Sequence, residues 1–334
     1  MSEYQYYEFQ AIDRRLSPRE MAELRALSSR AHITPASFSN FYNWGDFKGD
    51  PKALMERYFD AFLYLANWGT RRLMLRLPSR LLDLETASRY CPGGSASAWA
   101  TGEHVIVEFT SDRESAGMTG REWEPEEDET GEGWLAAIIP VRGELARGDL
   151  RSLYLGWLLC AMAGELDEDA VEPPVPAGLR RLSAALEEMV RFLRFDADLI
   201  AVAAERSPDM GAVPPAEHVL AAWVARLPVQ EKDRLLLRLL GGDPHVGHEL
   251  LQRARRELAA AGEVRASKSG GKPRAVSELL ALAEARRAER LRQQAERERQ
   301  ERERRAREEA ARRASYLAQL ANREEQAWQQ VEEL

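Results

Sequence analysis

The sequence predicts an α+β fold in which a mixed or antiparallel N-terminal sheet domain is followed by an all-helical domain and a long charged C-terminal helix. Three observations predict it. Aromatic residues, which favour sheet, are concentrated at the start of the chain, with 14 of the 26 in the first 70 positions. Proline and glycine divide the middle of the chain into short helical segments. The last 60 residues contain neither, and good helix formers dominate them.

These observations divide the 334 residues into four parts. We expect an α+β domain over 1–165, with an acidic loop at 111–133, and a helical domain over 166–261. A flexible basic linker is predicted at 262–274, where glycine and serine alternate with basic residues. The segment 275–334 is predicted to be one long charged helix with apolar ends.

Strands and short helices alternate at the start of the chain. Extended segments are expected at 4–12 and 32–44. Between them Ser17 starts a helix, because its hydroxyl can accept from the backbone of Glu20 while the Glu20 side chain reaches back. Asp50, followed by proline, starts a second short helix.

Two hairpins are predicted next, separated by a helix at 79–90. In the first, Asn67, Trp68 and Gly69 form the turn, and Gly69 supplies the positive φ that such turns need. The strands of the two hairpins are expected at 62–66, 71–77, 96–100 and 104–109.

The second half of the chain is predicted to be almost entirely helical. After the acidic loop, 134–141 is expected to be a buried strand. Asp149 then caps a helix over 150–163, which is apolar nearly all round and should be central to the fold. Five more helices are expected at 178–193, 196–206, 215–226, 229–240 and 246–261.

Charge is unevenly distributed along the chain. The formal charge of −8 divides into −11 for residues 1–261, +3 for 262–274 and zero for 275–334. An acidic body repels phosphate, so nucleic-acid binding is disfavoured. Most of the acidic excess lies around 111–133, which we interpret as a solvated loop, with a docking arm for a basic partner as the alternative.

The C-terminal segment gives the clearest physical signal. Opposite charges stand four residues apart throughout it, as in Arg299 and Glu303, and each such pair stabilises an isolated helix by about 0.2–0.5 kcal/mol. Between Arg292 and Arg313 alanine is the one apolar residue type, so this part lacks the seam of a strong coiled coil. A partly frayed charged tail is the alternative interpretation.

Apolar residues gather at both ends of this helix. The C-terminal patch consists of Leu317, Leu320, Trp328 and Val331. We expect it to bind a protein partner, or a second copy of the chain. Leu334 stands within the same apolar series, so we expect the natural protein to continue beyond it.

A second candidate surface lies around two Asn-Trp-Gly turns, at 43–45 and 67–69. Exposed aromatic residues beside arginine are typical of binding hot spots. The residues gathered there are Trp44, Asp46, Phe47, Lys48, Trp68, Arg71 and Arg72. The alternative is that both tryptophans simply close the core.

The sequence identifies no catalytic residue, cofactor site or metal site. His245 and His248 stand three apart, whereas the metalloprotease pattern uses a four-residue spacing with glutamate inside the pair. Cys91 is expected to be the more exposed of the two cysteines. Cys160 stands in the most apolar helix, where a thiol normally packs without reacting.

Compartment and membrane association follow from composition. Two cysteines 69 positions apart form no disulfide framework, and the N-terminus lacks a secretory signal. The longest apolar segment, around 153–163, is too short to span a bilayer. We therefore expect a cytoplasmic protein that does not enter a membrane.

Three strings in the N-terminal part carry a resemblance. The opening MSEYQYYEFQAIDR, the segment 42–50 and the segment 66–74 resemble an uncharacterised bacterial protein family, and the likeness continues to 328–331. The resemblance implies a bacterial source and further helix beyond the end of this chain. It implies no activity and no site residue.

Together these features predict a non-enzymatic bacterial adaptor. It would bind a protein partner through the C-terminal helix and the aromatic turns. The alternatives are a component or regulated protease substrate of a bacterial defence system, such as a CRISPR-associated one, and an enzyme of unrecognised chemistry.

Overall fold

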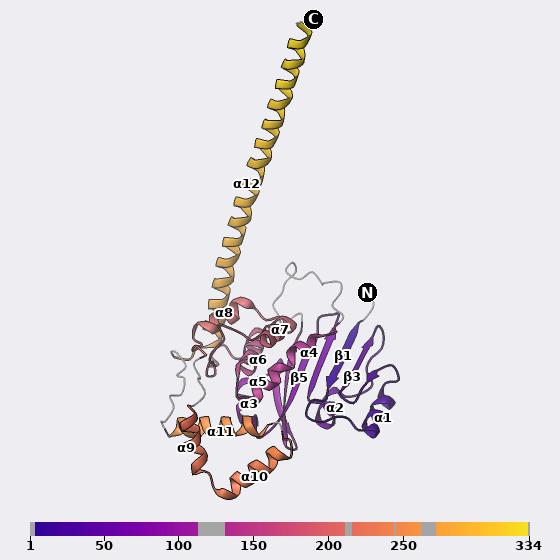
Figure 1. The fold of residues 1–334 in the computed structure, drawn as a ribbon, viewed down its shortest axis with the longest axis vertical. Coiled ribbons are helices and arrows are strands. Elements are labelled where there is room, and N and C mark those ends of the chain that lie inside the picture. Colours follow the sequence, from indigo (N-terminus) through magenta and orange to yellow (C-terminus); the bar gives the residue numbers. More distant parts are fainter. Residues whose placement is uncertain (1–3, 113–130, 211–215, 244, 262–271, 333–334) are drawn as a thin grey trace. The chain divides into compact units, whose positions relative to one another are not determined.

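The computed structural model describes residues 4–112, 131–210, 216–243, 245–261 and 272–332. Most of the predicted acidic loop and linker therefore lie outside the described residues. Within the described part the fold is α+β, with an N-terminal sheet, then helices and a long final helix, as predicted (Figure 1). The chain divides into two compact units, residues 1–282 and 283–334.

Seven strands form one antiparallel sheet in the order β2-β3-β1-β4-β5-β7-β6. Their bounds are β1 Gln5–Gln10, β2 His32–Ile33, β3 Ser37–Tyr42, β4 Ala61–Ala66, β5 Arg71–Pro78, β6 Ala96–Thr101 and β7 His104–Ser111. Both predicted hairpins are confirmed, as β4–β5 and β6–β7. Strand β1 lies between β3 and β4, with Tyr7 opposite Asn40 on one side and Tyr64 on the other.

An aromatic core covers one face of the sheet. The ring of Phe9 lies 4.5 Å from that of Phe62 and 5.6 Å from that of Phe38, measured between centroids. Helices α1 (Pro18–Leu27) and α2 (Pro51–Arg57) close this face with buried leucine and methionine side chains. The predicted capping box at Ser17 and Glu20 is confirmed, which explains where α1 begins.

A layer of helices covers the opposite face. It consists of α3 (Leu84–Tyr90), α4 (Trp134–Ile138), α5 (Pro140–Ala146) and α6 (Arg151–Met162), with α7 (Ala184–Phe192) packed on α4 and α5. The strands present fully buried aliphatic side chains to it, among them the paired Leu63 and Leu73 and the paired Leu75 and Val107.

Helix α6 is central to this layer, as its apolar sequence predicts. Every side chain from Arg151 to Ala161 is buried. Gly156 lets the helix approach strand β7 closely, because a Cβ atom there would lie 2.6 Å from the Phe109 ring. Asp149 accepts a hydrogen bond from the backbone N–H of Arg151 and so satisfies one free donor at the helix start.

The prediction of a buried strand at 134–141 is wrong. The segment forms α4 and the first residues of α5, with Pro140 at the start of α5. The buried side chains of α4 and α5 recur every three or four residues, at Leu135, Ile138, Val141, Arg142, Leu145 and Ala146. That spacing places them on one helical face, so the helical period and not the apolar content decides the structure.

The predicted helices between 196 and 261 are confirmed as α8 (Ala197–Glu205), α9 (Glu217–Arg226), α10 (Val229–Leu240) and α11 (Val246–Ala260). Helices α9 and α11 share a small core around Trp223 and Leu258. His245 Nε2 lies 3.2 Å from Asp13 Oδ1, and the Gln252 side chain donates to the carbonyl of Ala146. The helical segment is therefore part of the first compact unit.

The last helix, α12 (Val276–Glu332), begins inside the first unit. Arg274, predicted to end a flexible linker, is only 1% exposed. Its guanidinium forms two hydrogen bonds with Glu172, at 2.9 and 2.8 Å. The Tyr154 hydroxyl donates to the same carboxylate. This buried cluster fixes the start of α12.

Candidate functional site

The two Asn-Trp-Gly turns are built by the same backbone requirement. Gly45 and Gly69 have φ values of 78° and 114°, which favour glycine. The second turn is tied to β1, because Asn67 and Tyr4 exchange hydrogen bonds of 3.0 Å through the Asn67 backbone N–H and its side-chain oxygen. Strand β1 therefore holds the second turn beside the ends of β4 and β5.

A cavity of about 480 Å³ lies at these turns. We call it the turn cavity. It is lined by residues from β1, the turns, the start of α2 and strands β4 and β5: Gln5, Tyr7, Asp46, Phe47, Gly49, Pro51, Tyr64, Trp68, Thr70 and Arg72. Its volume lies within the range of small-molecule sites in proteins.

The amide of Gln5 is the centre of the polar network in the turn cavity. Its nitrogen donates to the carbonyl of Gly45 at 3.1 Å and to Asp46 Oδ1 at 2.8 Å. Its oxygen accepts from the hydroxyls of Tyr7, at 2.8 Å, and Tyr64, at 3.0 Å. The side chain is buried, so all four bonds hold it in one orientation.

Aromatic rings form the wall behind this amide. The Tyr7 ring lies 4.7 Å from that of Tyr64 and 5.3 Å from that of Phe47. A side chain at Gly49 would collide with the Phe47 ring, at 2.5 Å, so this glycine is required by close packing. Burial raises the pKa of Tyr64 to about 12 and also raises the pKa of Tyr7, so both phenols are protonated at neutral pH.

Among the described residues that line the turn cavity, Arg72 is the one cation. Its Nε and Nη2 atoms donate to Glu108 Oε1 at 2.9 and 2.6 Å. The other oxygen of Glu108 lies 2.9 Å from the Lys52 ammonium. The Glu108 carboxylate is almost fully buried, so it is a close and strong counter-ion for Arg72.

The structure brings together four of the predicted surface residues. The turn cavity is lined by Asp46, Phe47, Trp68 and Arg72. Trp44 lies outside it, 69% exposed, with the Arg30 guanidinium 5.1 Å above its ring. Arg71 is 2% exposed, and its Nη1 donates to the carbonyl of Phe192. Consecutive strand residues point to opposite faces, so Arg71 and Arg72 cannot share one surface.

The three residues that form the amide–phenol network of the site were not among the predicted ones. Gln5, Tyr7 and Tyr64 lie on the face of the sheet that also carries Phe9 and Phe62. The alternation of Gln5, Tyr7 and Phe9 along the first strand is visible in the sequence. The pairing of β1 with β4, which brings Tyr64 beside them, is not.

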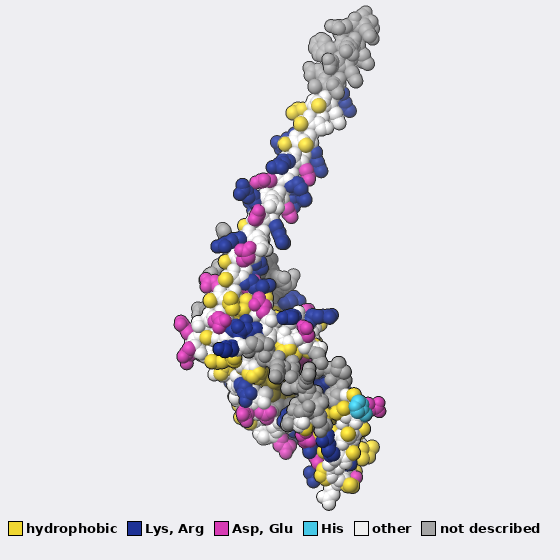
Figure 2. All heavy atoms as spheres, turned by 90° about the vertical axis from the view of Figure 1, so that its left-hand side faces the viewer, with side chains coloured by type: hydrophobic (Ala, Val, Ile, Leu, Met, Phe, Trp, Pro, Cys, Tyr) yellow, Lys and Arg dark blue, Asp and Glu magenta, His cyan; other side chains and the backbone are white. Residues whose placement is uncertain are grey.

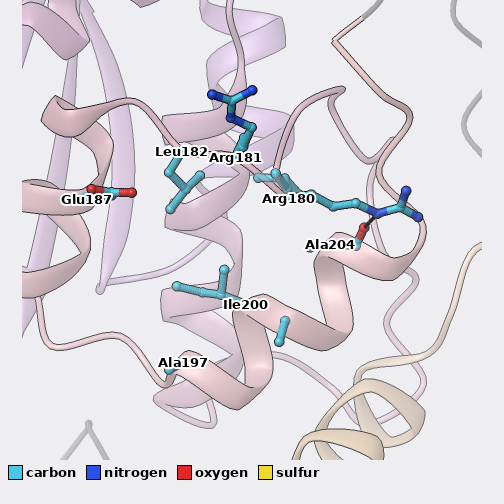
Figure 3. A pocket seen from close by; sticks show the side chains of 9 residues that line it. Arg180, Arg181, Leu182, Glu187, Ala197, Ile200 and Ala204 are labelled. Atoms are coloured by element: carbon cyan, nitrogen blue, oxygen red, sulfur yellow. Dashed lines mark hydrogen bonds between the residues drawn. The ribbon is translucent and has the colours of Figure 1, made fainter.

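A second cavity, of about 660 Å³, lies between the segment 179–182 and α8 (Figure 3). Its lining is Leu179, Arg180, Arg181, Leu182, Glu187, Ala197, Ile200, Ala201 and Ala204. The Arg180 side chain follows the end of α8, where it donates to the carbonyls of Ala204 and Glu205. Its main polar group therefore caps a helix. The turn cavity, where several polar groups converge, is the stronger candidate.

The predicted C-terminal patch is described only in part. Leu317 is 63% exposed. The side chains of Leu320, Trp328 and Val331 lie outside the described residues.

Groups suited to catalysis are scarce in the described part of the chain. It holds no cluster of three or more histidine, cysteine or acidic side chains placed to bind a metal ion. Both cysteines are buried and free, and Cys91, predicted to be the more exposed of the two, is 5% exposed against 0% for Cys160. Burial raises the pKa of Cys160 to about 12 and raises that of Cys91 as well, so neither thiol is reactive at neutral pH.

No protein-family model, curated protein sequence or solved structure matches this chain. Among the helices of the described ranges, none combines the length and the apolar character needed to cross a membrane.

Proposed function

We propose that this chain is a non-enzymatic adaptor that binds a protein partner through α12 and the exposed aromatic turns. The observation that carries the proposal is the exposure of α12. Every residue from 288 to 319 is exposed, although the helix is continuous. The exposed stretch 288–319 offers its surface to another molecule.

Ion pairs between successive turns support the exposed helix without packing. Arg299 lies 3.1 Å from Glu303, and four further pairs with the same spacing lie within 3.8 Å. Arginine and glutamate side chains accordingly alternate along the described part of α12 (Figure 2). Each pair contributes about 0.2–0.5 kcal/mol, so together they favour the helix before any partner binds.

Apolar side chains near the end of the described helix supply the proposed contact. Tyr316 and Leu317 are each 63% exposed. Burying a leucine in an interface gives roughly 1.5–3 kcal/mol, far more than one exposed ion pair. Trp44 and Trp68, which are 69% and 47% exposed, provide a second apolar surface in the first unit.

A bacterial cytoplasmic setting is part of the proposal. It is supported by the resemblance of the opening residues to a bacterial family and by the two free cysteines.

The experiment compares two full-length variants that differ in one apolar contact. Leu317→Glu places a charge in the apolar patch, whereas Gln319→Glu makes the same charge change two residues away at an exposed polar position. Partner retention from extract of the source cells is quantified by mass spectrometry against the unmodified chain. We expect Leu317→Glu to lose about 10-fold or more of one specific partner and Gln319→Glu to retain it.

Equal retention by the two variants would refute the proposal, because a partner held elsewhere is indifferent to Leu317. Sedimentation of the purified chain distinguishes a second copy from a different protein. A dimer that Leu317→Glu dissociates identifies the partner as the chain itself.

A further inference from the structure

The hydrogen-bond network of the turn cavity fixes the orientation of the Gln5 amide. Its two neighbours on the nitrogen side, the carbonyl of Gly45 and the carboxylate of Asp46, can only accept hydrogen bonds. The nitrogen must therefore face them, and the oxygen must face Tyr7 and Tyr64. In a flipped amide the Gln5 oxygen would face two acceptors, the Gly45 carbonyl and the Asp46 carboxylate, and both of these hydrogen bonds would be lost.

This orientation decides what the tyrosines can offer a ligand. Both phenol hydrogens are used in donating to the one oxygen of Gln5. The indole N–H of Trp68 is also used, since it donates to the Thr70 hydroxyl at 3.1 Å. The phenol oxygens of Tyr7 and Tyr64 can therefore act toward a ligand only as acceptors.

The carboxylate of Asp46 adds a negative charge to these acceptors. One of its oxygens accepts from Gln5. In the part of the chain that the structure describes, Asp46 forms no ion pair, in contrast to Glu108, which holds both Arg72 and Lys52. Arg72 is thus bonded to a carboxylate that it shares with Lys52, whereas Asp46 has no cation within ion-pair distance among the described residues.

The aromatic wall favours the same kind of ligand. Tyrosine and tryptophan faces attract cations through the ring quadrupole, by about 0.5–2 kcal/mol. Tyr7, Tyr64 and Trp68 line one cavity with Asp46, so ring faces and a carboxylate act on the same small volume. The first unit, residues 1–282, carries a formal net charge of −9, which increases the local concentration of cations.

From these observations we infer that the turn cavity binds an organic cation bearing N–H donors, that is, an alkylguanidinium or alkylammonium group. The donors bond to Asp46 and to the phenol oxygens of Tyr7 and Tyr64, and the cation lies against the aromatic rings. A volume of about 480 Å³ accommodates a group of this size together with the chain that carries it.

The test uses the full-length chain labelled with 5-fluorotryptophan. The ¹⁹F resonance of Trp68 is assigned by its loss in Trp68→Phe. Agmatine, an alkylguanidinium, is titrated as the probe, and we expect a saturable shift of the Trp68 signal. Tetramethylammonium, a cation without N–H donors, and acetate, an anion, serve as probes that should shift it much less.

Two variants with the same charge change locate the site. Asp46→Asn keeps the oxygen that accepts from Gln5 but removes the charge, and we expect agmatine to bind about 10-fold more weakly. Asp50→Asn is the matched control. Asp50 caps α2 and does not line the turn cavity, and asparagine caps a helix equally well. The affinity of the Asp50→Asn variant for agmatine should therefore be unchanged. Tyr64→Phe, which removes one acceptor, should weaken binding by a smaller factor.

Equal binding of agmatine by the Asp46 and Asp50 variants overturns the inference, as does acetate or tetramethylammonium binding as tightly as agmatine. A short peptide containing arginine distinguishes the source of the cation. Tighter binding of the peptide than of agmatine points to a partner protein, and weaker binding points to a free metabolite. Leu317→Glu should leave agmatine binding unchanged, because Leu317 does not line the turn cavity. The cation site and the adaptor proposal can therefore be refuted independently of each other.

Discussion

Arg274 anchors the residues just before α12 in the first compact unit. Its guanidinium bonds to both oxygens of Glu172, and its Nη1 donates to the carbonyl of Val202 at 2.9 Å. Residue 276 follows with a backbone hydrogen bond to the carbonyl of Ala170. A buried charge is tolerated when its donors find acceptors, and all three nitrogens of the Arg274 guanidinium donate a hydrogen bond.

We predict that Arg274→Ala lowers the free energy of unfolding by about 3–5 kcal/mol, because it leaves the Glu172 carboxylate buried without a counter-ion. Urea unfolding followed by tryptophan fluorescence measures the loss. The control is Arg299→Ala, which removes an exposed ion pair of α12 and should cost less than about 0.5 kcal/mol. Similar costs for the two variants would contradict a structural role for the buried pair.

The sequence could not predict these roles of single residues. Arg274 follows a run of glycine, serine and lysine, and nothing in that composition distinguishes it from a solvated linker residue. The sequence does not reveal the contact of Gln5 with Tyr64 either, because the two residues are 59 positions apart and meet only through the pairing of β1 with β4. Local patterns specify elements, whereas both clusters are made by tertiary contacts.

At the scale of elements, α6 packs closely against β7. Gly156 faces the Phe109 ring, and the Ala96 side chain is also close, 3.1 Å from where a Cβ would lie. Phe109 is fully buried, so its ring has little room to move. Overpacking of this kind costs about 1–3 kcal/mol.

We predict that Gly156→Ala destabilises the protein, although alanine has the higher helix propensity by about 1 kcal/mol. Gly247→Ala is the matched control, because Gly247 is also helical and has open space where its Cβ would lie. Thermal unfolding should show a lower midpoint for the first variant and an equal or higher midpoint for the second. A higher midpoint for Gly156→Ala would mean that α6 does not pack as closely as described.

Most elements could be predicted from local signals. The capping box at Ser17, the turn glycine at Gly69 and the prolines between the later helices all fall where elements begin or end. The segment 134–141 is the exception. Its apolar content fits a strand. The helical spacing of Leu135 and Ile138 becomes distinctive only when the buried residues of α5, which follow at the same spacing, are included.

The molecule as a whole combines two kinds of stability. The first unit is held by buried cores on both faces of the sheet, whereas the described part of α12 in residues 288–319 is exposed throughout. Exposed ion pairs weaken as salt screens them, but buried apolar contacts do not. Removing the exposed part of α12 should therefore leave the stability of the first unit unchanged, whereas removing residues that its core buries should lower it.

We predict that a chain ending at Leu282 unfolds cooperatively with the midpoint of the full-length protein, and that a chain ending at Pro273 does not. The longer chain keeps Arg274 and the buried Val276 and Leu279, whereas the shorter one loses all three and leaves Glu172 unpaired. Urea unfolding of both chains, followed by circular dichroism and fluorescence, measures the difference. Loss of cooperative unfolding in the chain ending at Leu282 would show that residues beyond it are required for the first unit to fold.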